Sequence, residues 1–420
     1  MSVVTRTIGE QIVDPKLYAD DTAYRTLFAE LRRSDPLHLV DVEGFEPFWA
    51  VTKHADIREV ELNADVFINR PRGMLQSIAD TERIKQAQGG SRLMADTIVS
   101  MDGEDHKLYR GLTRDWFLPG NVKKLEGRIR ELANEFIDVM ESRGGSCDFL
   151  KDVAQWYPLR VITMILGIPE SDEPKILQLA QESFGFSDPD IAKEDAMKVR
   201  FQSMQQFFEY FTKVAEDRRA NPRDDLASLI ANGTIRGEPM GTFETLSYYV
   251  IVASAGHDTT SSSISGGLLA LIENPDELAK LRADPALIKV AVEEIFRWVS
   301  PVKHFFRTAT RDYELRGKTV KAGESLMLCY PSANFDEDVF DAPEKFRADR
   351  VPNPHLAFGG QGPHHCLGQP LARLEVRVFF EELLRRIDDI SLTGKPAAVE
   401  ASFVSGLKTL PVAFRSRQLV

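Results

Sequence analysis

Cysteine is scarce in this sequence, which has only Cys147, Cys329 and Cys366 among its 420 residues. An odd number cannot all pair, and their spacing matches no zinc site, so neither a disulfide framework nor a structural zinc cluster is expected. The ordinary interpretation of each is a small buried apolar residue. Cys147 and Cys329 have no unusual neighbours and keep that interpretation, whereas the surroundings of Cys366 do not fit it.

Long apolar runs and an excess of positive charge are also missing. No run approaches the roughly 20 apolar residues that cross a bilayer, and the N-terminus lacks the apolar segment of a secretory signal. The net charge of −12 disfavours nucleic acid and anionic membranes as partners. With 43% hydrophobic and 28% charged residues the composition is that of a folded globular chain. We therefore expect a cytoplasmic protein that binds neither nucleic acid nor membrane.

Helical periodicity dominates the chain. It covers residues 105 to about 230 and residues 369–387, and the longest predicted helix spans residues 242–273. Thr242 is a candidate cap for this long helix, and Asn274-Pro275 ends it. No internal repeat or long linker interrupts the sequence, so a single domain over residues 1–420 is predicted.

Strand character is confined to short stretches, which makes the predicted fold class mainly α with small β-sheets (α+β). A β-rich edge is predicted at about residues 37–65 and 310–330. Residues 38–52 predict a hairpin, and residues 314–328 predict strand, glycine-containing turn and strand. The tail FVSGLKTLPVAF predicts a second hairpin with Ser405-Gly406 at its tip.

The segment HLAFGGQGPHHCLGQPLARL surrounds Cys366 with glycines. Gly359, Gly360 and Gly362 precede the cysteine and Gly368 follows it, a density that allows positive φ angles and close approach of backbone to a flat ligand. Cys366 also stands just before a predicted helix, whose unpaired N–H groups and dipole stabilise a thiolate. A thiolate bound to haem iron favours cleavage of the O–O bond.

This loop resembles the haem-binding signature F-G-x-G-x-H-x-C-x-G of the cytochrome P450 family. The matching positions are Gly360, Gly362, His364, Cys366 and Gly368. The position of the signature's phenylalanine is Gly359 here, and Phe358 stands one residue earlier. The resemblance implies haem b as cofactor, held between the long central helix and the helix after the cysteine. It implies Cys366 as the axial ligand of the iron, with Phe358 and Gly368 beside the cofactor.

Two further motifs lie at the spacing that the family has. Glu294 and Arg297 form E-x-x-R, and a P-x-x-F-x-x-x-R motif ends at Arg350. By itself an i,i+3 pair on a helix is usually an ordinary surface ion pair. In the family these three residues form a buried structural charge network, and the resemblance implies the same here.

The run Ala255-Gly256-His257-Asp258-Thr259-Thr260 lies midway along the long predicted helix. A glycine and hydroxyls that bond back to the i−4 carbonyl can open a helix locally. Taken alone, this run would be interpreted as a helix kink with solvated polar groups. The resemblance implies that Asp258 and Thr259 form the family's catalytic proton-delivery pair, that Ala255 lies against the cofactor and that His257 points away from it.

Basic residues at four positions match those that bind haem propionates in the family. They are His106 and Arg110, which are i,i+4 on one predicted helix, together with Arg307 and His364. An arginine suits a carboxylate through its planar fork. Each alone would more often be a surface charge.

The resemblance also predicts the substrate pocket. Its predicted lining residues are Ile251, Ser254, Ala255, Phe305 and Val404, within segments that include Lys303 to Phe306 and the loop at residues 70–99. Residues 184–211 are expected to cover the entrance, although aromatic residues there are more often core than ligand contacts. Arg70, Arg72 and Arg92 could anchor a carboxylate, but loop arginines are more often solvated. This composition favours a compact apolar molecule.

The predicted function is that of a haem-thiolate monooxygenase. With no flavin or nicotinamide fingerprint in the chain, its two electrons would come from a ferredoxin or flavodoxin with its reductase. A basic patch could receive this donor: Lys107, Arg114, Lys123, Lys124, Arg373 and Arg377. The enzyme would use O2 to hydroxylate a monoterpene, an alkylbenzene or an aromatic hydrocarbon. The protein is expected to be a monomer. Open alternatives are a steroid or fatty-acid hydroxylase, a peroxide-driven hydroxylase and a non-catalytic haem- or ligand-binding protein.

Overall fold

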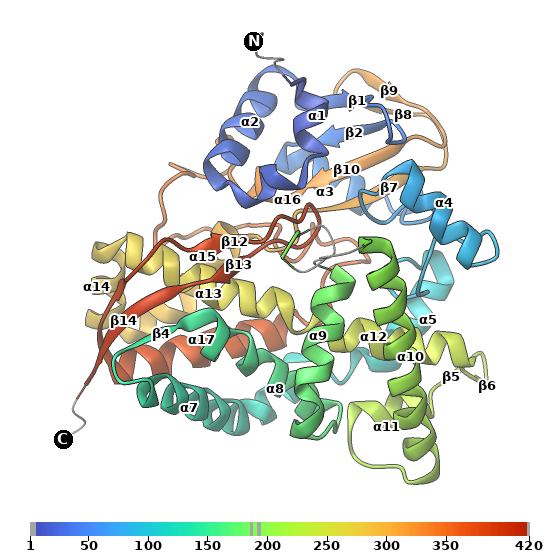
Figure 1. Cartoon of the computed structure of the whole chain (residues 1–420). Helices are drawn as coiled ribbons and strands as arrows, with labels where there is room; N and C mark the ends of the chain where they lie inside the picture. The colour runs from blue at the N-terminus through green and yellow to red at the C-terminus, as the bar shows by residue number, and fades with distance from the viewer. Residues whose placement is uncertain (1–5, 185–187, 191–194, 418–420) are drawn as a thin grey trace.

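The computed structural model describes residues 6–184, 188–190 and 195–417. Figure 1 shows a small β-rich part next to the N-terminal helices and a larger helical part that contains most of the remaining chain. The N-terminal elements are α1 (Ile8–Ile12), a 3₁₀ turn (Pro15–Ala19) and α2 (Asp21–Ser34). Helices dominate, so the predicted mainly α class with small sheets is confirmed.

A five-stranded sheet forms the β-rich part, with strand order β1-β2-β10-β7-β3. Its strands are β1 (Leu37–Val40), β2 (Phe48–Val51), β3 (Phe67–Ile68), β7 (His304–Ala309) and β10 (Ser325–Cys329). β1 and β2 pair antiparallel, as the hairpin prediction for residues 38–52 required, and β10 runs parallel to β2. Side chains alternate along β10, since Leu326 and Leu328 are in one buried cluster and Met327 is in another on the opposite face.

Helix α3 (His54–Leu62) lies inside the range 37–65 that the sequence assigned to a β-rich edge. That part of the prediction is wrong because Ile57 and Val60 follow helical spacing and are both buried against the sheet. In the second range, β8 (Tyr313–Leu315) and β9 (Lys318–Val320) form a hairpin, so the strand–turn–strand prediction is confirmed.

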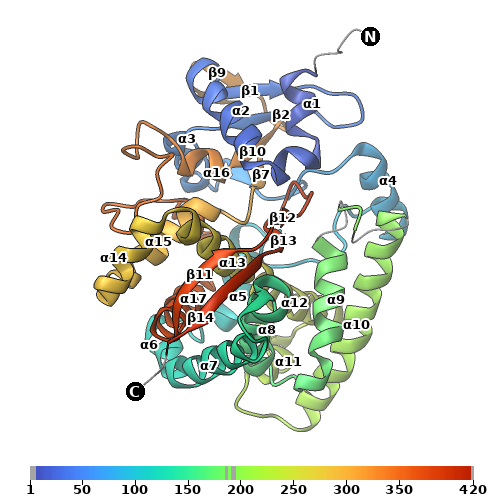
Figure 2. The ribbon, with the colours of Figure 1, turned by 60° about the vertical axis from the view of Figure 1, so that its left-hand side comes forward.

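The C-terminal segment differs from its prediction. The hairpin expected within FVSGLKTLPVAF does not form. Instead β13 (Leu407–Thr409) pairs with β12 (Ala397–Ala398), and β14 (Pro411–Ser416) pairs with β11 (Ile387–Leu392) and with β4 (Ser146–Asp148). These strands run diagonally across the helical part in Figure 2. The prediction failed because each strand found a partner outside the segment, and Ser405 is instead tied through its N–H to the Pro301 carbonyl at 3.0 Å.

The helical part confirms the helices predicted over residues 105–230 and 369–387. Its elements are α4 (Ile78–Ala87), α5 (Gly103–Arg114), α6 (Pro119–Val122), α7 (Glu126–Ser142), a π-helical turn (Leu150–Ala154), α8 (Trp156–Ile165), α9 (Glu173–Phe184), α10 (Ala196–Ala220), α11 (Leu226–Ala231), the short hairpin β5 (Thr234–Ile235) and β6 (Glu238–Pro239), α14 (Pro275–Ala283), α15 (Ile288–Val299), α16 (Tyr330–Asn334) and α17 (Gln369–Arg386). Among the described residues, none of these helices is both long and apolar enough to cross a membrane.

The long central helix is interrupted. α12 (Thr242–Ala255) and α13 (Asp258–Glu273) replace the single predicted helix, with Gly256 and His257 between them (Figure 1). The predicted opening is thus confirmed, while the prediction of one continuous helix is wrong. Gly256 allows close packing here, because a Cβ would lie 2.8 Å from a methyl carbon of Ile162 on α8, whose side chain would have to shift. The N-cap is Gly241 rather than Thr242.

Candidate active site

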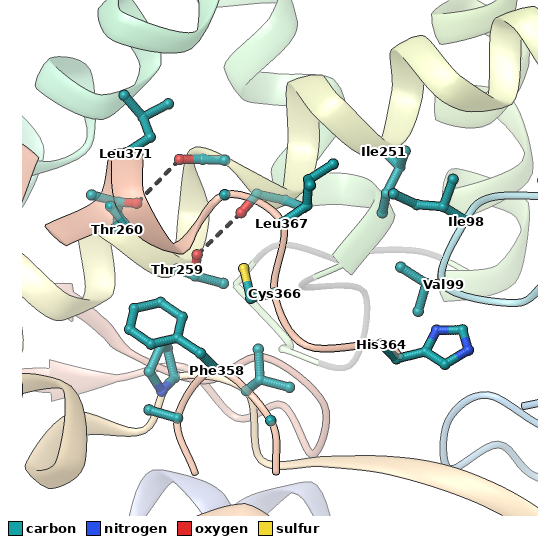
Figure 3. Close-up of a pocket in the computed structure, with 18 of the residues that line it drawn as sticks. Ile98, Val99, Ile251, Thr259, Thr260, Phe358, His364, Cys366, Leu367 and Leu371 are labelled. Atoms are coloured by element: carbon teal, nitrogen blue, oxygen red, sulfur yellow. Dashed lines mark hydrogen bonds between the residues drawn. The ribbon is translucent and has the colours of Figure 1, made fainter. Parts of the chain in front are cut away.

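A cavity of about 250 Å³ lies between the α12–α13 interruption and the loop that precedes α17 (Figure 3). Cys366 faces it from the loop, and Ile251 and Thr259 line it from the two central helices. Figure 3 shows Ile98 and Val99 on one side of Cys366 and Thr259 on the other. Apolar side chains provide most of the wall, so a flat apolar ligand can be enclosed next to the thiol.

Cys366 is held at the start of α17. Its N–H donates to the carbonyl of Phe358 at 2.9 Å, and Gly368 is the N-cap of the helix. Burial raises the pKa of the Cys366 thiol, whereas the N–H of Gly368, the positive charge of Arg110 and the N–H of Gln369 lower that pKa. The thiol is accessible from the cavity. These groups stabilise a thiolate that needs a positively charged partner, such as a metal, in the cavity.

The glycines of the loop act partly through a contact that the sequence did not predict. A Cβ at Gly360 or Gly362 would clash with Glu61, which lies in α3. Gly359 has a φ of +89°, which disfavours other residues, whereas Gly368 has open space around it and lines the cavity. Gly359 and Gly368 therefore face the ligand space, whereas the absence of a side chain at Gly360 and Gly362 lets α3 pack against the loop.

The four basic residues predicted to bind propionates come together at one edge of the cavity. Arg110, Arg307 and His364 line it, and His106 stacks on His364 with ring centroids 3.9 Å apart. Burial lowers the pKa of His106 to about 4 and that of His364 to about 2. Nε2 of His106 is buried and has no hydrogen-bond partner among the described residues. This edge suits an anionic group.

Glu61 is a site residue that the sequence prediction missed. Its carboxylate accepts hydrogen bonds from Arg307 Nη2 at 3.2 Å, from the Tyr330 hydroxyl at 2.7 Å and from the N–H of Gly360. Glu61 and Arg307 are both buried. The arginine expected to bind the ligand is therefore oriented by a carboxylate on α3.

Thr259 and Asp258 lie at the start of α13, where the central helix is interrupted. The Thr259 hydroxyl donates to the Ala255 carbonyl at 3.1 Å, and the Thr260 hydroxyl donates to that of Gly256 at 3.2 Å (Figure 3). His257 is buried and bonds the Gln155 carbonyl at 3.0 Å through Nε2, so its ring points away from the cavity. Its Nδ1 lies 2.9 Å from Asp258 Oδ1.

The predicted charge network is present and buried. Arg297 bonds both carboxylate oxygens of Glu294, at 2.7 and 2.8 Å, and Arg350 Nε bonds the same oxygens at 3.0 and 3.2 Å. Arg297 also donates to the carbonyls of Asn334 and Pro343, both at 2.9 Å. The network thereby connects α15 to the segment that leads into the cysteine loop.

A second cavity of about 220 Å³ adjoins the first. Residues that line both cavities are Val99, Ile251, Ala255, Thr259, Val302 and Phe305. The structure brings all five predicted pocket residues to the second cavity: Ile251, Ser254, Ala255, Phe305 and Val404. Asp258 also lines it, so the acid faces the second cavity and the alcohol faces both.

Other pocket predictions do not match the structure. Lys303 lines neither cavity, because its backbone N–H is bound to Phe403 and its side chain turns to the Val299 carbonyl. Of the predicted cover, Phe201, Phe207 and Phe208 belong to or pack on the main core, and α10 contributes Arg200 and Met204 to the cavity instead. Phe186 lies outside the described residues.

Two of the three loop arginines differ from the expectation of solvated side chains, whereas Arg70 is exposed as expected. Arg72 and Arg92 line the second cavity, and Arg72 is buried. Arg92 is paired with Glu46, with Nη1 3.1 Å from Oε2. Arg70 lines neither cavity and is paired with Asp96 at 2.6 Å. The sequence could not distinguish these three because the difference depends on tertiary packing.

Glu375 is a second missed residue. It lies on α17, lines the first cavity, and is buried with Oε2 unbonded among the described residues. Burial raises the pKa of Glu375 well above its usual value. Glu375 therefore adds a buried carboxyl group to the cavity wall, and a glutamate within an amphipathic helix gives no sequence signal for this.

The predicted basic patch is partly neutralised. Arg373 bonds both oxygens of Glu293, at 2.7 and 3.0 Å, and Arg377 pairs with Glu126 at 3.0 Å and Glu381 at 2.8 Å. Arg114 is also paired, with Asp115 at 3.2 Å, so the members without an ion pair among the described residues are Lys107, Lys123 and Lys124.

Comparisons with known proteins agree with this geometry. Residues 78–400 match the sequence model of the family described as Cytochrome P450. The chain is 40% identical to cytochrome P450-terp of a Pseudomonas species, with 98% of both chains covered. It is 35% identical to the methyl-branched lipid omega-hydroxylase of Mycobacterium tuberculosis, covering 94% of this chain and 91% of that one. The crystal structure of CYP108D1 from Novosphingobium aromaticivorans matches with a TM-score of 0.92 and 41% identity, over 99% of this chain and 100% of that one.

The residues around the first cavity fit the cofactor of that family, haem b. A cysteine thiol faces an apolar space, and a cationic edge with an orphaned buried imidazole nitrogen is present where two propionates need partners. Two carboxyl groups line this cavity among the described residues: Glu61, whose charge is matched by Arg307, and Glu375, whose pKa is raised by burial. The chain is therefore a member of the cytochrome P450 family, a haem b-binding oxidoreductase that acts as a monooxygenase.

Proposed function

We propose that this protein hydroxylates a small, mainly apolar molecule such as a monoterpene, an alkylbenzene or an aromatic hydrocarbon, with O2 and an external electron donor. The observation that carries the proposal is the second cavity, which is compact, mostly apolar and continuous with the thiol-facing cavity at Thr259. The 40% identity to cytochrome P450-terp supports the same size class of substrate. A cavity of about 220 Å³ is small among ligand sites, which disfavours a whole steroid.

The roles of the site residues follow from their positions. Cys366 would bind the haem iron, with Phe358, Ala255 and Gly368 against the cofactor. His106, Arg110, Arg307 and His364 would hold its propionates. Haem, when bound, supplies the centre at which O2 is reduced. One oxygen atom enters a C–H bond and the other leaves as water, with two electrons from the donor and two protons.

Thr259 and Asp258 would deliver those protons. The hydroxyl of Thr259 lines both cavities and is oriented by the Ala255 carbonyl, so it can pass a proton to a group between the cavities. Asp258, one residue earlier, faces the second cavity and is next to His257. This acid–alcohol pair favours an O2-dependent monooxygenase over a peroxide-driven hydroxylase or a non-catalytic haem protein. The apolar walls exclude bulk water from the reacting carbon.

The electron donor is proposed to be a ferredoxin or flavodoxin with its reductase. The unpaired cations of the basic patch, Lys107 and Lys123 among them, suit an acidic donor, whereas the ion-paired Arg373 and Arg377 contribute less. A cytoplasmic monomer would be accessible to such an external donor.

The experiment is a product assay with purified holoenzyme, a surrogate ferredoxin system and isotopically labelled O2. We expect α-terpineol and p-cymene to give hydroxylated products that carry the label, and only when the donor is present. Equal product from peroxide alone would favour the peroxide-driven alternative. Spectral binding of a steroid without binding of either small compound would overturn the proposed substrate class.

A further inference from the structure

Arg72 is a buried cation in the wall of the second cavity, and no part of the proposed chemistry uses it. It has only 7% of its surface exposed, although it lies in the loop after β3. Its guanidinium lies over the ring of Phe306, with Cζ 4.3 Å from the ring centroid, and 5.1 Å from that of Phe48. Packing on these two rings fixes the side chain, so it is preorganised rather than mobile.

The hydrogen bonds of Arg72 leave one side of its fork free. Nη1 donates to the carbonyls of Glu46 at 3.2 Å and Pro47 at 3.4 Å. Nη2 has no hydrogen-bond partner among the described residues. Burial lowers the pKa of Arg72 to about 10, so the side chain remains charged at neutral pH. An unpartnered N–H of a buried cation is costly unless an acceptor meets it.

Neither carboxylate that lines the second cavity forms an ion pair with Arg72 among the described residues. Glu46 is paired with Arg92, and Asp258 lies next to His257. No ion pair among the described residues balances the charge of Arg72 in the cavity wall. A bound anion would balance this charge, whereas a neutral alcohol would satisfy one N–H and leave the charge.

We infer that Arg72 binds a carboxylate of the substrate, so that the preferred substrates are compact apolar carboxylic acids. This inference rests on the proposed function and narrows its substrate class. The remainder of the wall suits the apolar body of such a molecule, since Met74, Met94 and Met204 are adaptable side chains.

The position of Arg72 also sets the site of oxidation. Arg72 lines only the second cavity, whereas Thr259 lies where the two cavities meet. A molecule with its carboxylate at Arg72 directs its opposite, apolar end toward Thr259. The hydroxylated carbon is therefore remote from the carboxylate.

The test compares two probes with one carbon skeleton, 4-isopropylbenzoate and 4-isopropylbenzyl alcohol, by spectral titration of the holoenzyme. Wild-type protein should bind the acid at least tenfold more tightly than the alcohol. Arg72→Met should weaken acid binding at least tenfold and change alcohol binding less than twofold, because a charged hydrogen bond contributes about 1.5–3 kcal/mol. Arg70→Met is the matched control, since Arg70 is the neighbouring loop arginine outside both cavities, and it should bind both probes as wild type does.

Equal affinity of wild type and Arg72→Met for the acid would overturn the inference, as would oxidation of the acid next to its carboxylate. If Arg72→Met does not bind haem, Arg72→Lys decides. This variant keeps the charge but loses the planar fork, so it should bind the acid more weakly than wild type and the alcohol as wild type does. Acid binding at wild-type strength in Arg72→Lys would overturn the inference. A wild type that binds the alcohol but not the acid refutes only the Arg72 inference. A wild type that binds neither refutes the proposed function.

Discussion

Glu61 and Arg307 form a buried ion pair, with Glu61 Oε1 3.2 Å from Arg307 Nη2, between α3 and β7. The same carboxylate receives the Tyr330 hydroxyl and the N–H of Gly360. One residue thereby links the β-sheet, the cysteine loop and an arginine that faces the haem cavity. The stability of the cysteine loop and the orientation of the cationic edge consequently depend on one residue, Glu61.

Glu61→Gln should destabilise the protein strongly. The substitution leaves Arg307 buried without its charge partner, which costs about 3–5 kcal/mol in typical buried pairs. Denaturant unfolding of the haem-free protein measures the loss, because a propionate of bound haem would also face Arg307. The control is Asp312→Asn, which breaks the exposed pair with Lys321 and should change the stability little. An equal effect of both variants would contradict the role of the Glu61 contact.

Two glycines of the cysteine loop should respond differently to alanine. In Gly362→Ala the new Cβ meets the Glu61 carbonyl, so the fold should lose about 1–3 kcal/mol with or without the cofactor. In Gly368→Ala the Cβ meets no protein atom within 4 Å but enters the haem cavity. We expect normal apoprotein stability and faster haem loss for Gly368→Ala, measured by transfer to apomyoglobin. Equal apoprotein stability of the two variants would refute this assignment.

His304 should make stability depend on pH. Its Nε2 accepts the Leu75 N–H at 2.9 Å, and burial lowers the pKa of His304 to about 3. The unfolded chain, with a pKa of about 6.5, binds this proton first as the pH falls. Stability is therefore complete above about pH 6.5 and decreases toward pH 3, by roughly 1.4 kcal/mol per pH unit for one proton.

His304→Gln keeps an acceptor for the Leu75 N–H. Between pH 6.5 and 4, the slope of its unfolding free energy against pH should be smaller than that of wild type by the contribution of about one proton. The matched control is His38→Gln, since His38 is only partly buried and lies beside Asp35. If His304→Gln kept the full wild-type slope of stability against pH, the imidazole of His304 would not be the cause of the pH dependence.

Thr259→Ala should separate O2 consumption from product formation. Without the hydroxyl, proton transfer between the cavities is lost, and general acid–base groups contribute about 10²–10⁴-fold. We expect at least a tenfold lower product yield per O2 consumed, with peroxide released instead. Thr260→Ala is the control, because its hydroxyl bonds Gly256 in the same way but Thr260 lines only the first cavity. A normal yield in Thr259→Ala would remove Thr259 from the mechanism.

The features that the sequence predicted well are those in which the chemistry is local. The glycine-rich approach to Cys366 and the run from Ala255 to Thr260 each carry their own signal within a few residues. The resemblance to the cytochrome P450 family then predicted the propionate-binding roles of Arg110 and Arg307, which the structure places at one edge of the cavity.

The features that it missed depend on distant contacts. Glu61 is separated from Arg307 by 246 residues, and nothing in the sequence of α3 marks it as special. The burial of Arg72 depends on Phe48 and Phe306, which no periodicity connects to a loop arginine. The prediction of a hairpin in the C-terminal tail was wrong because β14 pairs with β11. Local turn signals do not reveal competition from a distant strand.

The most direct test of the account is the absorption spectrum of the reduced carbon monoxide complex. Ligation by Cys366 predicts the red-shifted Soret band of a haem thiolate in wild type and in Cys147→Ser, whose cysteine lies far along the chain in β4. The same band must disappear in Cys366→Ser. An unshifted Soret band in the wild type, or a red-shifted band that survives in Cys366→Ser, would contradict the assignment of Cys366 as the iron ligand.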